Sequence, residues 1–98
     1  MSTENHADDL DIPLIADRMA WHRKECEGLT QAEYAERAGL KRTQYNNWEK
    51  GTQRLSLSGA MKLRAEFGLS LDFLFFGTIE TLPAHLYRRW RETHPDAN

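Results

Sequence analysis

The chain has 98 residues, of which 13 are Lys or Arg, 15 are Asp or Glu, and one, Cys26, is a cysteine. This length suits a single domain with one core, and a lone cysteine excludes an internal disulfide framework. No apolar run approaches the roughly 20 residues of a membrane helix, and the acidic, polar N-terminus is unlike a signal peptide. We therefore expect a cytoplasmic protein that does not contact membranes.

Charge is distributed unevenly along the chain. Residues 1–17 hold five acidic side chains and no Lys or Arg, whereas residues 18–66 hold ten Lys or Arg against six Glu. A locally basic segment suits contact with phosphate groups, although the formal net charge of the whole chain is −2. The distribution therefore keeps nucleic acid among the candidate partners.

The N-terminal part of the chain predicts a tail followed by a helix. Residues 1–10 have little to bury, so we expect a disordered acidic tail. Asp11 can cap a helix that has Pro13 in its first turn. The apolar spacing that follows predicts that this helix runs to about Glu27 and that Gly28 ends it.

Two short helices with a tight turn between them are predicted next. Thr30 and Glu33 form a capping-box pattern at the start of a helix over 31–38, which Gly39 ends. A second helical pattern covers residues 41–50. Two helices joined by so short a turn cross at a steep angle, as in the unit that places its second helix in the DNA major groove.

The C-terminal half predicts three more helices. After a loop over 52–57, Ser58 can cap a fourth helix that stops at Gly68, and Ser70 can cap a short fifth helix. A last helix is predicted over 82–93. No strand-like alternation persists beyond a few residues, so the predicted fold class is all-α.

Four motifs in this order carry a resemblance to a known family. They are Gly28-Leu29-Thr30-Gln31, Tyr34-Ala35, Trp48-Glu49-Lys50-Gly51, and Ser70-Leu71-Asp72-Phe73-Leu74 with Gly77. Residues 15–77 resemble the lambda-repressor-like, Cro/CI-type helix-turn-helix domain, also called the XRE family. The resemblance implies a compact five-helix DNA-binding domain within residues 11–77. It leaves residues 1–10 as the tail and residues 78–98 as an additional C-terminal helical extension, a candidate dimerisation element.

The chain departs from the family pattern in two places. The first helix runs one residue longer before Gly28 than is usual in the family. The resemblance implies an Arg–Glu ion pair that gives Glu49 a structural role, and this extra residue leaves open whether Arg23 or Lys24 is the partner. The loop after Gly51 also lacks the proline common in the family.

The helix over 41–50 carries side chains that suit base edges. If Tyr45 and Trp48 pack in the core rather than stack on bases, polar residues occupy the outer face. Arg can contact guanine O6 and N7, Asn or Gln can contact adenine N6 and N7, and the Thr methyl group can contact thymine. The outward residues are Arg42, Thr43, Asn46 and Asn47, with Gln44 on the flank.

The resemblance also divides these positions by role. It implies base reading by Arg42, Thr43 and Asn47, and phosphate contacts by Lys41 and Gln31. Gln31 begins a helix, where backbone N–H groups favour a phosphate oxygen. Arg54, in the loop that follows, is predicted to be a second phosphate contact.

An apolar stripe continues beyond the five-helix unit. Leu82, Leu86 and Trp90 lie at helical spacing, after a run of apolar residues over 73–76. The last helix could fold back on its own chain, or it could form a dimer interface. The residues leave both roles open.

The sequence thus predicts a sequence-specific regulator of transcription that binds double-stranded DNA, namely a repressor that occupies an operator as a homodimer. The alternative is an antitoxin-like or accessory module whose main partner is another protein. The histidines form no ligand-spaced pair with Cys26 and are expected at surface or half-buried positions. No catalytic arrangement stands out, so we expect no metal, no cofactor and no enzyme activity.

Overall fold

The first helix changes its winding halfway along. In the computed structural model, which describes residues 11–96, α1 (Ile12–Trp21) begins at Asp11, whose carboxylate accepts a hydrogen bond from the Leu14 N–H at 3.2 Å. The same rod then continues as a π-helix, η2 (His22–Glu27), and ends at Gly28 with φ +63°. The predicted cap and stop are confirmed, whereas the predicted acidic tail lies outside the described residues.

The π-helix accommodates the additional residue of the first helix. Its hydrogen bonds run from residue i to i+5, so its turn is wider than that of an α-helix, and such segments usually occur as single turns inserted in α-helices. Widening one turn absorbs one residue without rotating the helix on either side.

The two central helices form as predicted. In α2 (Gln31–Ala38), the Glu33 N–H donates to Thr30 Oγ1 at 3.1 Å, and the Thr30 N–H donates to Glu33 Oε1 at 2.9 Å, which completes the capping box. Gly39 ends this helix in the left-handed conformation, with φ +73°. The next helix, α3 (Arg42–Lys50), starts three residues later.

The fourth helix begins before its predicted cap. In α4 (Leu57–Phe67), Ser56 is the cap, and its hydroxyl accepts from the Gly59 N–H at 3.0 Å. The predicted cap, Ser58, is an exposed residue within the helix. Leu55, the residue directly before Ser56, is buried in the core. Its position fixes the end of the loop and places Ser56, rather than Ser58, at the helix start.

The C-terminal part also starts its last helix later than predicted. Ser70 caps α5 (Leu71–Phe76) as expected, and a short 3₁₀ turn, η3 (Ile79–Thr81), follows. The last helix, α6, spans Ala84–Thr93 rather than 82–93. Leu82 is extended, because a proline disfavours the helical conformation in the residue before it.

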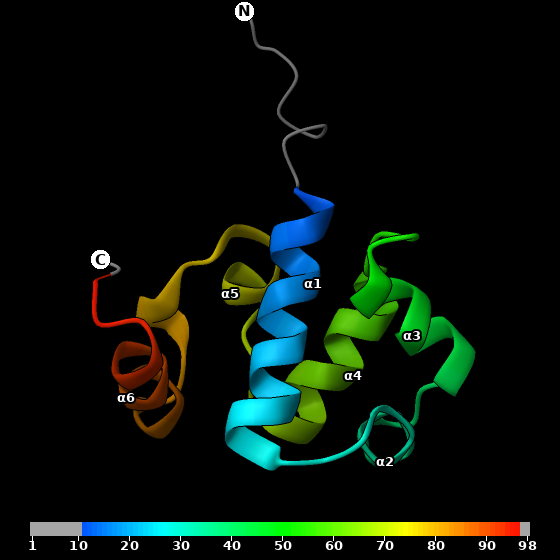
Figure 1. Cartoon of the computed structure of the whole chain (residues 1–98), viewed down its shortest axis with the longest axis horizontal. Helices are drawn as coiled ribbons and strands as arrows, with labels where there is room; N and C mark the ends of the chain where they lie inside the picture. The colour runs from blue at the N-terminus through cyan, green and yellow to red at the C-terminus, as the bar shows by residue number, and fades with distance from the viewer. Residues whose placement is uncertain (1–10, 97–98) are drawn as a thin grey trace, which may run out of the picture.

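All regular elements of the described chain are helices, which confirms the predicted all-α class. Figure 1 shows α1 in the middle, with α2, α3 and α4 on one side and α5 and α6 on the other. Aromatic side chains link the two sides within one core. The largest fully buried side chains include Tyr34, Tyr45, Phe73, Met19 and His22.

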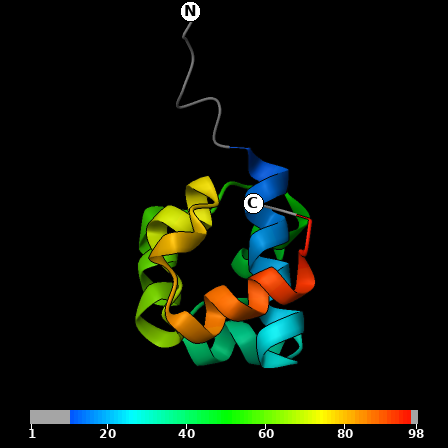
Figure 2. The ribbon, with the colours of Figure 1, turned by 90° about the vertical axis from the view of Figure 1, so that its left-hand side faces the viewer.

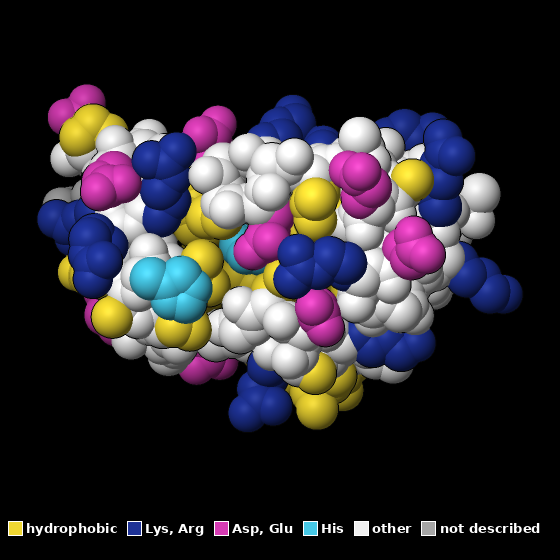
Figure 3. Space-filling view, turned by 90° about the horizontal axis from the view of Figure 1, so that it is seen from below, with side chains coloured by type: hydrophobic (Ala, Val, Ile, Leu, Met, Phe, Trp, Pro, Cys, Tyr) yellow, Lys and Arg dark blue, Asp and Glu magenta, His cyan; other side chains and the backbone are white. Residues whose placement is uncertain are grey.

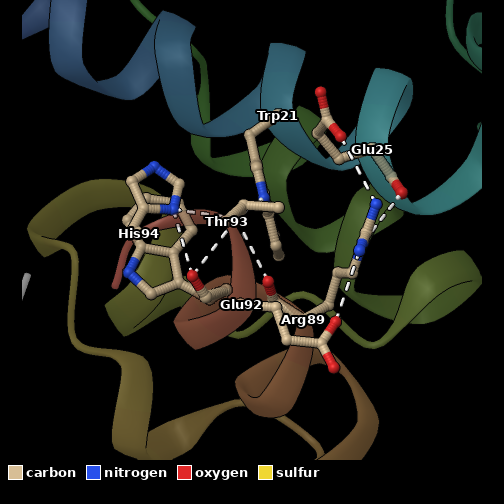
Figure 4. A network of polar contacts seen from close by, with 7 residues as sticks. Trp21, Glu25, Arg89, Glu92, Thr93 and His94 are labelled. Carbon is tan, nitrogen blue, oxygen red and sulfur yellow. Dashed lines mark hydrogen bonds and ion pairs between the residues drawn. The ribbon is translucent and has the colours of Figure 1, made fainter. Parts of the chain in front are cut away.

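The last helix folds back on its own chain. In Figure 2, α6 crosses the face of the molecule toward the rod formed by α1 and η2. The indole N–H of Trp21 donates to Thr93 Oγ1 at 2.9 Å, and the Trp21 ring meets that of Trp90 edge-on, with centroids 4.9 Å apart. Arg89 donates to the Glu25 backbone oxygen at 3.2 Å (Figure 4). Of the two roles left open for the apolar stripe, intramolecular packing is therefore the one observed.

Candidate nucleic-acid interface

The inner face of α3 anchors this helix in the core. Tyr45 and Trp48 are both buried, which favours packing over base stacking for these aromatic rings. On the opposite face, Arg42, Thr43 and Gln44 are exposed. Because α3 and α6 lie at opposite ends of the molecule (Figure 1), the face of α3 is uncovered by the C-terminal extension.

The two asparagines of α3 lie at the margin of this exposed face. Both Asn46 and Asn47 are partly buried, and Asn46 Oδ1 is fully buried without a hydrogen-bond partner among the described residues. The backbone oxygen of Asn47 accepts from the Thr52 N–H at 3.0 Å and from its hydroxyl at 3.1 Å. Asn46 is therefore less available to a base than its sequence position suggests.

A buried ion pair connects α3 to η2. Arg23 Nε lies 3.0 Å from Glu49 Oε2, and Arg23 Nη2 lies 2.9 Å from Glu49 Oε1, so the pairing is bidentate. The two side chains are 11% and 7% exposed, respectively. Lys24 is exposed instead. Arg23, in the first turn of η2, is therefore the partner that the sequence left undecided.

Glu49 also holds both helices of the helix-turn-helix unit. Its carboxylate accepts from Gln31 Nε2 on α2 at 2.8 Å and from the Tyr45 hydroxyl on α3. Burial alone would raise the pKa of Glu49, but the hydrogen bonds from Arg23, Tyr45 and Gln31 outweigh it and lower that pKa. The carboxylate is therefore ionised at neutral pH, and its negative charge is balanced by Arg23 within the protein.

The predicted phosphate contacts occupy the edges of α2 and α3. Gln31 is the first residue of α2, and one N–H of its amide is directed at Glu49. Because a Gln amide has two N–H groups, the second remains available for an anion. Lys41 precedes the first residue of α3, and Arg54 follows its C-terminal turn; both are exposed.

Exposed cations without an acidic partner among the described residues surround α3, and Arg88 and Arg91 on α6 share this property. Seen from below, Lys and Arg side chains project at both ends of the molecule (Figure 3). At the α6 end, Arg89 pairs with Glu25 and Glu92. At the α3 end, four cations make no salt bridge with any other residue of 11–96; these are Lys41, Arg42, Lys50 and Arg54. Lys50, the last residue of α3, is a candidate phosphate contact beside Arg54.

Two short helices joined by a tight turn, the second of which exposes a polar face, form the arrangement of a helix-turn-helix unit. A family model described as helix-turn-helix matches residues 23–74, which is more than half of the chain. The chain belongs to this family, that of the XRE or lambda-repressor-like DNA-binding regulators. A search of curated proteins returned no match, and neither did a search of solved structures. None of the described helices is long and apolar enough to cross a membrane.

Proposed function

We propose that this protein is a repressor of transcription that binds an operator in double-stranded DNA as a homodimer, with α3 in the major groove. One observation carries the proposal. The α3 helix buries Tyr45 and Trp48 and exposes a polar face whose neighbouring cations have no acidic partner among the described residues. Such a face offers donors to base edges and positive charge to phosphates.

The proposed division of labour follows the position of each side chain. Arg42, Thr43 and Asn47 read bases, and Gln44 and Asn46 act at the flanks. Three residues around this base-reading face contact phosphates. They are Lys41 at the start of α3, Gln31 at the start of α2, and Arg54 in the loop after α3.

The proposal is tested by measuring binding to a selected operator and to a random duplex over a series of salt concentrations. Arg42→Ala should lose about 1–3 kcal/mol of discrimination between the two, because a bidentate base contact is removed. Arg54→Ala should weaken both complexes alike and make the salt slope shallower by about one. Arg54 serves better than Gln31 here, because replacing Gln31 would also remove a hydrogen bond to Glu49.

Arg88→Ala is the matched control, since Arg88 is an exposed arginine on α6 at the other end of the molecule. It should leave both complexes unchanged. If substitutions at Arg42, Thr43 and Asn47 also leave operator binding unchanged, α3 is not the reading helix.

A protein-interaction role is the second candidate. Leu57 and Met61 lie one turn apart on α4 and are 63% and 45% exposed, which is unusual for large apolar side chains. An antitoxin-like or accessory module would use such a surface for another protein. This function would be favoured if the chain bound no duplex at low salt while Leu57→Ser abolished its capture of a protein partner.

A further inference from the structure

Two unpaired cations lie on either side of the turn that ends α3. Lys50 is the last residue of α3 and Arg54 lies just after the turn, with Gly51 between them. Both side chains are exposed, and neither makes a salt bridge with another residue of 11–96. Before DNA is bound, this pair is free to attract another anion.

The chain enters the fold beside the same turn. Ile12 is the first residue of α1, and its Cγ2 lies 3.7 Å from the position that a Cβ on Gly51 would occupy. Asp11, which caps α1, is therefore next to the C-terminal end of α3. Figure 1 shows this proximity of the start of α1 to the loop that follows α3.

The ten residues that precede this point are rich in negative charge. They contain Glu4, Asp8 and Asp9, and no Lys or Arg. Asp8 is three residues from Asp11, so it lies within about 11 Å of it along the chain. Glu4 is seven residues away, within about 25 Å, which exceeds the roughly 14 Å length of a nine-residue helix such as α3. The segment that carries these acidic residues is therefore longer than α3 itself.

We propose that residues 1–10 act as an intramolecular competitor of DNA phosphate at Lys50 and Arg54. A short tether gives the acidic side chains an effective concentration in the millimolar range. DNA must displace them, whatever its sequence, so the tail weakens binding to all duplexes by a similar factor. The preference among sequences stays with α3. This inference rests on the proposed function, because it assigns a regulator to the same binding surface.

The test compares two variants of the full chain that lose the same amount of negative charge. The tail variant carries Glu4→Gln, Asp8→Asn and Asp9→Asn, and the control variant carries three substitutions in the C-terminal part of the chain. The control substitutions are Asp72→Asn, Glu80→Gln and Asp96→Asn, all at exposed positions without a salt bridge to another residue of 11–96. Binding to a labelled random duplex of 20 base pairs is measured by fluorescence anisotropy at 50 mM and 200 mM salt.

The tail variant should bind about three- to tenfold more tightly than the control variant at 50 mM salt, since two exposed ion pairs are removed from the free state. The difference should shrink at 200 mM salt, where exposed charges are screened more strongly. The ratio of operator to random-duplex affinity should stay the same. Equal tightening in both variants would show an effect of net charge alone and would overturn the proposal.

A second readout needs no DNA and separates this inference from the proposed function. Backbone amide shifts of residues 50–55 should differ between the original chain and the tail variant at 50 mM salt, and the difference should fade at high salt. Shift changes confined to the first turn of α1 would mean that the acids act only on that helix end, which overturns the tail contact. If the tail contact is seen but no variant binds duplex, the proposed function fails instead.

Discussion

At Gly59 the absence of a side chain lets α4 approach α3 closely. A Cβ at this position would lie 2.2 Å from Trp48 Cη2, far inside van der Waals contact. Replacing a helical Gly by Ala ordinarily stabilises a protein by up to about 1 kcal/mol, whereas overpacking a core costs about 1–3 kcal/mol. We expect Gly59→Ala to lower the melting temperature. Ser58→Ala, at the exposed neighbouring position, should change it little, and equal melting of both variants would contradict the close packing.

His22 is a buried histidine, which corrects the expectation of a surface or half-buried side chain. Its Nδ1 lies 2.7 Å from the Tyr34 hydroxyl, and its ring meets that of Phe67 edge-on. Burial lowers the pKa of His22 from 6.5 to about 4, with the positive charges of His85 and Arg37 adding to the effect. The folded protein therefore holds this ring neutral at pH 7.

This lowered pKa predicts acid sensitivity. A group with a depressed folded-state pKa contributes its full stability above the unfolded value of 6.5, and loses it as the pH falls toward 4. The loss should be about 2 kcal/mol at pH 5 and about 3 kcal/mol at pH 4. Urea unfolding between pH 7.5 and 5 measures it. His22→Gln should be less stable at pH 7.5 but should show a flatter profile, and parallel profiles would argue against this role of His22.

At the scale of elements, Glu49 holds η2, α2 and α3 together. Removing one member of a buried ion pair costs about 3–5 kcal/mol, because the other charge is left without a partner. We expect Glu49→Ala to lose stability of this size in urea unfolding. The double variant Arg23→Met/Glu49→Leu should recover part of the loss, since neither charge then remains buried. Unchanged unfolding of Glu49→Ala would show that the pair has no structural role.

The π-helical turn gives a second prediction at this scale. Deleting Lys24, an exposed residue of η2, should convert the wide turn to an α-helical one and leave Arg23 in reach of Glu49. The deletion variant should therefore fold cooperatively and keep its affinity for duplex DNA. Deleting Lys62 from the regular helix α4 is the control, and it should abolish folding because all later residues rotate by about 100°. If both deletions unfold the chain in circular dichroism, the π-helix is required as it stands.

At the scale of the whole molecule, the packing of α6 changes where a dimer could form. Leu82 and Leu86 are buried within one chain, so the apolar stripe has little left to offer a second copy. The described part of the molecule measures 42 × 30 × 20 Å. Two copies side by side can place their α3 helices at the 34–36 Å spacing of adjacent major grooves.

We therefore expect dimerisation to be weak in solution and to be completed on DNA. A single module buries only about 600–1,000 Å² on DNA, so specific affinity calls for two half-sites. Sedimentation at micromolar concentration should show two chains per operator duplex and mostly monomer without DNA. A half-site duplex, which can hold one chain, is the control. One chain per full operator at saturation would contradict the proposed homodimer.

Local chemistry explains why so much of the fold could be read from the sequence. Capping residues and helix-ending glycines act within a few positions of the chain, so Asp11, Thr30 with Glu33, and Ser70 marked three helix starts correctly. Helical spacing placed Tyr45 and Trp48 in the core. The same spacing put Arg42 and Thr43 on the exposed face, because an α-helix that buries one side presents the other. It also placed Asn46 and Asn47 outward and Gln44 on the flank, whereas Gln44 is exposed and the two asparagines are partly buried.

Only the tertiary structure could decide the features that depend on contacts between distant residues. Whether Arg23 or Lys24 pairs with Glu49 depends on the helical conformation of residues 22–27, which form a π-helix. A π-helical turn has no local sequence signal comparable to a capping residue. Ser56 replaced Ser58 as the cap because the core takes up Leu55. The position of α6 could not be predicted either, because it too depends on contacts between distant residues. An apolar stripe on a helix indicates that this face is buried, but it does not show whether the same chain or a second copy covers it. Packing with Trp21 and Phe73 supplied that answer.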